Sequence, residues 1–190
     1  MSTVLQEKKA LRATCKELRL SIPSEAKALA DAAILYTVTA HSAFLDADLI
    51  LCFFPVRGEV DLTPIAEIAK SHGISVAFPR CEGDEMRFHT VTDLKELILD
   101  RFGIPAPRAD APIAIPTART LCLLPGLAAG RDGTRLGYGG GFYDRFLDTF
   151  GGITLFPIYE RLVLSTLPVE ATDHRVAHLV TEKGEIPLYG

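Results

Sequence analysis

The feature that most constrains this chain is a glycine-rich segment that lies between an apolar run and a helical pattern. Four of the five residues 137–141 are glycine, so the backbone there lacks the Cβ atoms that restrict other residues. Residues 120–124 form a strand-like apolar run before it, and residues 142–150 have helical spacing after it. This order of strand, glycine loop and helix is typical of phosphate sites, because loop N–H groups and a helix N-terminus both attract anions.

The residues that flank the glycines favour a ligand site over a simple connection. Glycine clusters often form turns without a ligand, and this one matches neither Gly-x-Gly-x-x-Gly nor Gly-x-x-x-x-Gly-Lys-Ser/Thr. Arg135 can clamp a phosphate through its planar guanidinium group. The Asp144 carboxylate can ligate Mg²⁺, which takes one or two carboxylates together with phosphate oxygens. The alternatives are a solvated arginine and a carboxylate that pairs with Arg145 or with the helix dipole.

Helical and apolar segments alternate along the chain and predict an α/β fold with a mainly parallel sheet. We expect helices over residues 4–20, over residues 24–42 with Ser24 as N-cap, and over residues 64–71 with Thr63 as N-cap and Pro64 at the first position. We expect strands over residues 49–54, 74–78, 86–91, 121–124, 153–158 and 176–181, and an irregular connection over residues 103–118. Ligands of such sheets bind at the carboxyl ends of strands, where residues 54–59 and 125–143 both fall.

The composition excludes several classes of function. At 190 residues, with 48% hydrophobic and 23% charged residues, the chain suits one ordinary domain. Its net charge of −4 argues against general binding to nucleic acid or to an anionic membrane. No apolar run approaches the roughly 18 residues of a membrane span, and the polar N-terminus lacks the apolar region of a signal peptide. The four cysteines are far apart and form no Cys-x-x-Cys pair, namely Cys15, Cys52, Cys81 and Cys122. This argues against a zinc or disulfide framework and suits a reducing cytoplasm.

Two carboxylates follow the first predicted strand. Glu59 either binds a polar heterocycle or a cation, or it serves the entry to the next helix. Asp61 stands closer to that helix, and its residue type favours helix entry. The sequence therefore makes Glu59 the stronger candidate for a binding role.

Basic residues and histidines give weaker indications. Lys8 and Arg12 lie on a basic helical stripe, which is usually a solvated face. His174 and His178 are four residues apart, but residues 176–180 have the pattern of a strand. This disfavours a helical pair of metal ligands.

Several segments together resemble the 5-formyltetrahydrofolate cyclo-ligase family. The matching segments are residues 8–12 with the family's Lys-x-x-x-Arg, residues 54–61 with its Glu-Val-Asp, residues 123–127 and 135–145 with its central motif, and residues 167–170 followed by Asp173 with its C-terminal block. The resemblance covers nearly the whole chain. It implies a three-layer α/β/α fold with a mainly parallel sheet, similar to ribose-phosphate isomerases and CoA transferases, in a single domain over residues 1–190.

The resemblance implies an ATP- and Mg²⁺-dependent ligase, and the cysteine pattern favours the cytoplasm. Such an enzyme converts 5-formyltetrahydrofolate, with or without a polyglutamate tail, to 5,10-methenyltetrahydrofolate and releases ADP and phosphate. The formyl oxygen is phosphorylated first, and N10 then closes the ring. From the acidic net charge and the lack of a long apolar run we expect no nucleic acid or membrane partner, and we expect a monomer or a small homo-oligomer.

The resemblance also assigns roles to residues. ATP would be bound by Lys8, Arg12, Arg135, Leu136, Gly137, Tyr138, Gly139, Gly140, Gly141, Phe142 and Tyr143. The folate would be bound by Glu59, Gly139, Gly140, Gly141, Phe142 and Tyr143. Arg135 and Tyr143 would be catalytic, and Asp144 would hold Mg²⁺.

The chain departs from the family at two of these places, and two other functions stay open. Phe142 stands where members often have tyrosine, so a hydroxyl is lost while the stacking area is kept. Ala177 stands where some members have a second metal-binding aspartate, so Mg²⁺ would be bound by Asp144, phosphates and water.

The alternatives to this enzyme are a catalytically silent nucleotide- or folate-binding relative on the same fold and a sugar-phosphate isomerase of similar architecture. The enzyme is favoured because five functional residues occur together, namely Lys8, Arg12, Glu59, Arg135 and Asp144.

Overall fold

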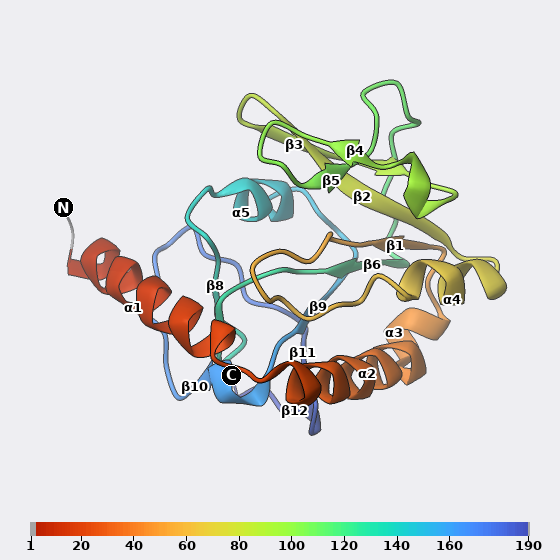
Figure 1. Cartoon of the computed structure of the whole chain (residues 1–190). Helices are drawn as coiled ribbons and strands as arrows, with labels where there is room; N and C mark the ends of the chain where they lie inside the picture. The colour runs from red at the N-terminus through yellow and green to blue at the C-terminus, as the bar shows by residue number, and fades with distance from the viewer. Residues whose placement is uncertain (1–2, 190) are drawn as a thin grey trace.

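The computed structural model describes residues 3–189, and a seven-stranded sheet runs through the middle of this part of the chain (Figure 1). The strand order is β12-β11-β9-β6-β1-β2-β3. The five strands from β11 to β2 are parallel, and β12 and β3 pair antiparallel at the two edges. The bounds are β1 Leu49–Leu51, β2 Ser75–Glu82, β3 Glu85–Thr90, β6 Thr120–Leu123, β9 Ile153–Pro157, β11 His178–Thr181 and β12 Gly184–Ile186. The predicted mainly parallel sheet is thus confirmed.

Helices cover both faces of this sheet. The bounds are α1 Thr3–Leu20, α2 Ser24–Ala40, α3 Ser42–Leu45, α4 Ile65–Ser71 and α5 Phe142–Leu147, with short 3₁₀ helices η1 Leu94–Glu96 and η2 Glu160–Leu162. α2 contacts β11 and β12, and α4 contacts both α2 and β2. α5 contacts β3 and lies on the other side of the sheet from α2 (Figure 1). This gives the expected three layers. Among residues 3–189, no helix combines the length and apolarity needed to cross a membrane.

Two small sheets shape the connections. β7 Ala128–Gly130 pairs antiparallel with β8 Arg135–Leu136 and parallel with β10 Val163–Leu164. β4 Ile98–Leu99 pairs antiparallel with β5 Pro105–Ala106, and β5 lies inside residues 103–118, which were expected to be irregular. The β7–β8 hairpin carries the chain from the carboxyl end of β6 back to the glycine loop, which therefore lies beside that end.

Two predicted helix caps are wrong. Pro23 holds the N-cap position of α2, and Ser24 is the first helical residue, with no side-chain cap bond. Pro64 holds the N-cap position of α4, again without a side-chain bond. Thr63 instead donates its N–H and its hydroxyl to the Asp61 carboxylate, at 3.0 and 2.7 Å. Asp61 therefore shapes the helix entry, as its residue type indicated.

Several element lengths differ from the predicted ones for local reasons. α5 ends at Leu147 and the chain turns before β9 through Gly151 and Gly152. A Cβ atom on Gly152 would lie 2.4 Å from the carbonyl oxygen of Thr120, so this close approach needs glycine. The strands that were not predicted have two or three residues each, which is too short for a period-two pattern, namely β4, β5, β7, β8, β10 and β12.

The core is centred on the paired strands β1 and β6. Ile50 and Leu121 are Cα partners in this pair, and each side chain is fully buried. We expect Leu121→Ala to lower the free energy of unfolding by about 2–5 kcal/mol, because it leaves a cavity between neighbouring strands. Chemical denaturation measures this change. Leu29→Ala on the exposed face of α2, where the residue is 75% exposed, is the matched control and should stay within about 0.5 kcal/mol. Equal stability of the two variants would contradict this account of the core.

Candidate active site

The segments that follow the neighbouring parallel strands β1 and β6 meet at the carboxyl end of the sheet. Glu59 lies in the loop after β1, and Tyr138 lies in the glycine loop that follows β8. The Tyr138 hydroxyl donates to Oε1 of Glu59 at 2.8 Å. The structure therefore brings together the two segments that the sequence placed at this edge.

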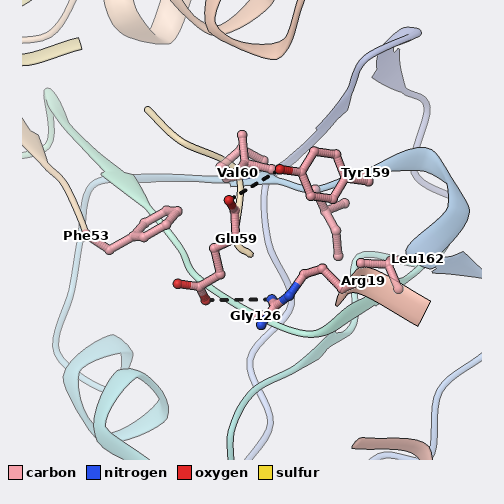
Figure 2. A pocket seen from close by; sticks show the side chains of 9 residues that line it. Arg19, Phe53, Glu59, Val60, Gly126, Tyr159 and Leu162 are labelled. Carbon is pink, nitrogen blue, oxygen red and sulfur yellow. Dashed lines mark hydrogen bonds and ion pairs between the residues drawn. The ribbon is translucent and has the colours of Figure 1, made fainter. Parts of the chain in front are cut away.

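The Glu59 carboxylate is buried and held from several sides. Its Oε2 accepts the Val56 N–H at 3.0 Å, and Nη1 of Arg19 lies 3.9 Å from its Oε1 (Figure 2). Burial raises the pKa of Glu59, while the Val56 N–H, the Tyr138 hydroxyl and the charges of Arg19 and Arg57 oppose that rise. A carboxylate offers about four lone-pair positions, so Glu59 retains acceptor capacity for the N–H groups of a ligand.

Three guanidinium groups pack against three glycines of the loop. The distances from an ideal Cβ atom are 2.9 Å from Gly137 to Nη1 of Arg135, 3.3 Å from Gly139 to Cζ of Arg12 and 2.7 Å from Gly141 to Nη1 of Arg145. Side chains at these positions would displace the arginines. The glycines thus allow positive charge to converge on the loop, as binding of a triphosphate requires.

Arg135 and Asp144 bind each other in this structure. Nη2 of Arg135 donates to Oδ1 of Asp144 at 2.7 Å, and Nη1 donates to the Pro125 carbonyl at 3.1 Å. The Arg135 side chain is 3% exposed and the Asp144 side chain 30%. Nε of Arg135 is buried without a hydrogen-bond partner, which marks a place where a ligand oxygen would be stabilised.

The two basic residues of α1 have different environments. Nε of Arg12 donates to the Gly137 carbonyl at 2.9 Å, which leaves its two Nη groups for a ligand. Nζ of Lys8 instead contacts Asp173 at 2.5 Å and Glu170 at 2.8 Å, and Lys8 is buried. Burial lowers the pKa of Lys8, but the two carboxylates outweigh it and raise the pKa overall. Arg12 therefore joins the glycine loop, whereas Lys8 ties α1 to the segment before β11.

The aromatic residues after the glycines line the same region. The Tyr143 hydroxyl is buried without a hydrogen-bond partner, and its ring meets Phe88 edge-on at 6.4 Å. Burial raises the pKa of Tyr143, so the phenol stays protonated and can donate. Phe142 is half-buried beside Arg145, whose Cζ lies 5.0 Å from its ring centroid. Leu136 is buried in the core, so only its backbone is available to a ligand.

Sequence reasoning missed Arg19, whose side chain is buried and bonds to three segments around the site. The helical periodicity of α1 could have indicated that Arg19 is buried. Arg19 stands four residues after Cys15, which is on the buried stripe of α1, so helical spacing places it on the inner face. A basic residue at such a position needs internal acceptors.

A histidine cluster at the edge of the sheet does not make a metal centre. His178 lies on β11, as its strand pattern predicted, and approaches His41 and Glu185. Nδ1 of His41 accepts the Ala43 N–H at 3.0 Å, so in the neutral ring the proton sits on Nε2, the atom that faces Glu185. A protonated Nε2 cannot ligate a metal. His174 lies apart and bonds to Asp148.

Comparison with known proteins gives one consistent result. A family model described as the 5-formyltetrahydrofolate cyclo-ligase family matches residues 4–182. The 5-formyltetrahydrofolate cyclo-ligase of Escherichia coli K12 is 30% identical and covers 71% of this chain and 78% of its own. The mitochondrial one of Arabidopsis thaliana is 25% identical over 99% of this chain and 78% of its own. The solution structure of Aquifex aeolicus 5,10-methenyltetrahydrofolate synthetase has a TM-score of 0.83 at 29% identity, covering 96% and 93% of the two chains.

The buried ion pairs of Lys8 lead to a stability prediction. We expect Lys8→Ala to lower the free energy of unfolding by about 1–3 kcal/mol, because it leaves Glu170 and Asp173 without their cation. The neighbouring variant Lys9→Ala is the control, since Lys9 is exposed, and it should change stability by less than about 0.5 kcal/mol. Denaturant titration of both variants measures the difference. Equal stabilities would mean that the pairs of Lys8 add nothing to folding.

Proposed function

The chain belongs to the 5-formyltetrahydrofolate cyclo-ligase family, and from that premise we propose how its residues carry out the reaction. The enzyme converts 5-formyltetrahydrofolate to 5,10-methenyltetrahydrofolate. We propose that ATP is the co-substrate, that Mg²⁺ accompanies it, and that residues 135–144 bind both. The observation that carries this proposal is the 2.8 Å hydrogen bond between Tyr138 and Glu59, because it joins a phosphate-type loop to a buried carboxylate.

The proposed first step makes a leaving group. The formyl oxygen attacks the γ-phosphorus of ATP, an O–P bond forms, and ADP departs with the electrons of the broken bond. Side chains assist such transfers mainly by positioning and by neutralising charge. The free Nη groups of Arg12, the unpartnered Nε of Arg135 and the loop N–H groups support this role.

The proposed second step closes the ring. N10 attacks the formyl carbon, the C–O bond breaks, and phosphate leaves with the bonding electrons while N10 loses its proton. N10 and the N5 that carries the formyl group belong to one bound molecule, so the closure is intramolecular. Correct orientation of that molecule then brings N10 close to the formyl carbon. Glu59 would orient the pterin ring by accepting its N–H groups. The unpaired hydroxyl of Tyr143 would donate to the formyl oxygen or to the phosphate that replaces it.

The residues around Asp144 fit a magnesium ion. Asp144 stands in the first turn of α5, directly after the glycine loop, and its carboxylate is partly exposed. When bound, Mg²⁺ would neutralise phosphate charge. It takes few protein carboxylates beside phosphate oxygens and water, which suits a site where Ala177 supplies no second ligand. Asp144 would then bind the ion in place of Arg135, and the guanidinium group of Arg135 would be released to bind the phosphates.

The same proposal covers the setting of the enzyme. We place it in the cytoplasm, because the cysteines of the described chain are unpaired thiols, which suits a reducing compartment. We further propose that the substrate is used with or without a polyglutamate tail, and that one catalytic domain over residues 1–190 acts as a monomer or a small homo-oligomer.

An absorbance assay tests the proposal directly. Purified protein is mixed with 5-formyltetrahydrofolate, ATP and Mg²⁺, and the near-ultraviolet band of 5,10-methenyltetrahydrofolate is followed. We expect the band to grow only when ATP is present. Growth without ATP would contradict the phosphorylation step, and no growth from folded, ATP-binding protein would favour a silent relative.

Asp144→Asn should lower turnover by about 10- to 100-fold while the protein stays folded, because an amide binds Mg²⁺ less well than a carboxylate. Raising Mg²⁺ should recover part of the rate. Asp148→Asn, at an exposed carboxylate just beyond the same helix, is the control and should keep wild-type kinetics. Full activity of Asp144→Asn at low Mg²⁺ would remove Asp144 from the metal site.

Glu59→Gln should weaken folate binding by about tenfold or more and change ATP binding by less than about twofold, because of the two substrates only the folate would contact this carboxylate. Calorimetry with each ligand separately measures the two effects. The control is Glu67→Gln on the exposed side of α4. Unchanged folate affinity would leave Glu59 with a purely structural role in its loop.

A further inference from the structure

Arg19 connects three separate segments of the site. It lies near the end of α1, and its side chain is 2% exposed. Nε donates to the Arg57 carbonyl at 3.0 Å, Nη1 to the Gly126 carbonyl at 2.9 Å and Nη2 to the Tyr138 hydroxyl at 2.5 Å. These acceptors belong to the loop after β1, the loop after β6 and the glycine loop. Glu59 lies opposite the same guanidinium group (Figure 2).

The bond to Tyr138 gives the hydrogen-bond chain a fixed direction. A guanidinium group has donors and no acceptor, so the Tyr138 oxygen must accept from Arg19. The single proton of the phenol is then left for Oε1 of Glu59. The order Arg19, Tyr138, Glu59 therefore favours the ionised carboxylate, which accepts hydrogen bonds, over the neutral acid.

Arg19 also holds an unfavourable backbone in place. Arg57 has φ of 52°, and Gly58 after it has φ of 76°. A side-chain-bearing residue in this left-handed region persists only where its surroundings fix it. The bond from Nε of Arg19 to the Arg57 carbonyl supplies that fixation just before Glu59. Without it, the segment can relax and carry the carboxylate away from its present direction.

We propose that Arg19 is a positioning residue for folate recognition, which aims Glu59 at the substrate ring through Tyr138 and the backbone of Arg57. This inference rests on the proposed contact between Glu59 and the folate. Arg19 acts on the folate rather than on ATP, because its bond to the glycine loop ends on the Tyr138 hydroxyl, which donates to Glu59. ATP would instead contact the backbone N–H groups of that loop, which neither Arg19 nor the hydroxyl occupies.

The pH dependence of folate binding gives a readout that a merely structural role would not move. The groups that face Glu59 are Arg19 from α1, Arg57 from its own loop, Tyr138 from the glycine loop, Tyr143 from α5 and Tyr159 after β9. The hydrogen bond from Tyr138 lowers the pKa of Glu59 against the effect of burial. Its loss raises that pKa, so as pH falls, folate binding should weaken at a higher pH than in the wild type.

The test uses Tyr138→Phe, which removes only the hydroxyl, and Arg19→Lys, which keeps the positive charge but loses the planar guanidinium group with its several N–H donors. Affinities for 5-formyltetrahydrofolate and for ATP are measured separately from pH 5 to pH 8, with thermal unfolding as a check of folding. We expect folate binding to weaken about tenfold in each variant and ATP binding to change less than about twofold. In Tyr138→Phe, the loss of folate affinity on acidification (the acid limb of the pH profile) should begin at a higher pH than in the wild type. Tyr36→Phe and Arg161→Lys, at exposed positions, are the matched controls.

A double-mutant cycle shows whether Arg19 acts through Glu59. In the Glu59→Gln background, Arg19→Lys should add little further loss of folate affinity, because the group that it positions is already gone. Additive losses would overturn the inference, as would wild-type folate affinity and acid limb in folded Tyr138→Phe. If Glu59→Gln itself binds folate normally, the proposed role of Glu59 falls as well. If it binds folate weakly while the other two variants do not, only the role of Arg19 falls.

Discussion

The parallel pairing of β1 with β6 is the constraint on which the rest of the site depends. Because the two strands run side by side in one direction, the segments that leave them emerge at the same edge of the sheet. Glu59 and Tyr138 are 79 residues apart in sequence and meet there through a single hydrogen bond. The buried side chains of both strands fix this register, so the position of the site follows from the packing of the core.

Pairing of buried charge determines which groups remain for a ligand. The side chains of Lys8, Arg19 and Arg135 are each no more than 4% exposed, and each meets carboxylate or carbonyl oxygens inside the protein. Such partners offset the cost of removing charge from water. Nε of Arg135 and the Tyr143 hydroxyl are buried without partners, and both belong to the proposed phosphate and folate region. Within residues 3–189, the buried side-chain polar groups left unsatisfied thus lie where the substrates are proposed to bind.

Sequence patterns predicted the mainly parallel sheet and the loop at the site, because these depend on periodicity and on glycine chemistry that few residues determine. The three layers came from the resemblance to the family. The patterns did not predict how charges pair across the fold. Lys8 and Arg19 look alike as basic residues of an amphipathic helix, yet one bonds to carboxylates near the end of the chain and the other to loops around Glu59. The predicted caps at Ser24 and Thr63 failed for a related reason. Neighbouring prolines and the Asp61 carboxylate changed the local hydrogen bonding in ways that residue preference alone does not encode.

The position of α1 in the chain has a consequence for how the enzyme forms. Among the described helices α1 precedes the others in sequence, yet its bonds reach 107 residues ahead to Gly126, 119 to Tyr138 and 165 to Asp173. Contacts of such long sequence separation form late, since the intervening chain must be ordered before they repay its entropy. Lys8 lacks its carboxylate partners until residue 173 is available, whereas the partners of Arg19 end at Tyr138. The docking of α1 therefore depends on segments far ahead of it in the sequence, and the surroundings of Glu59 are complete only once those segments are ordered.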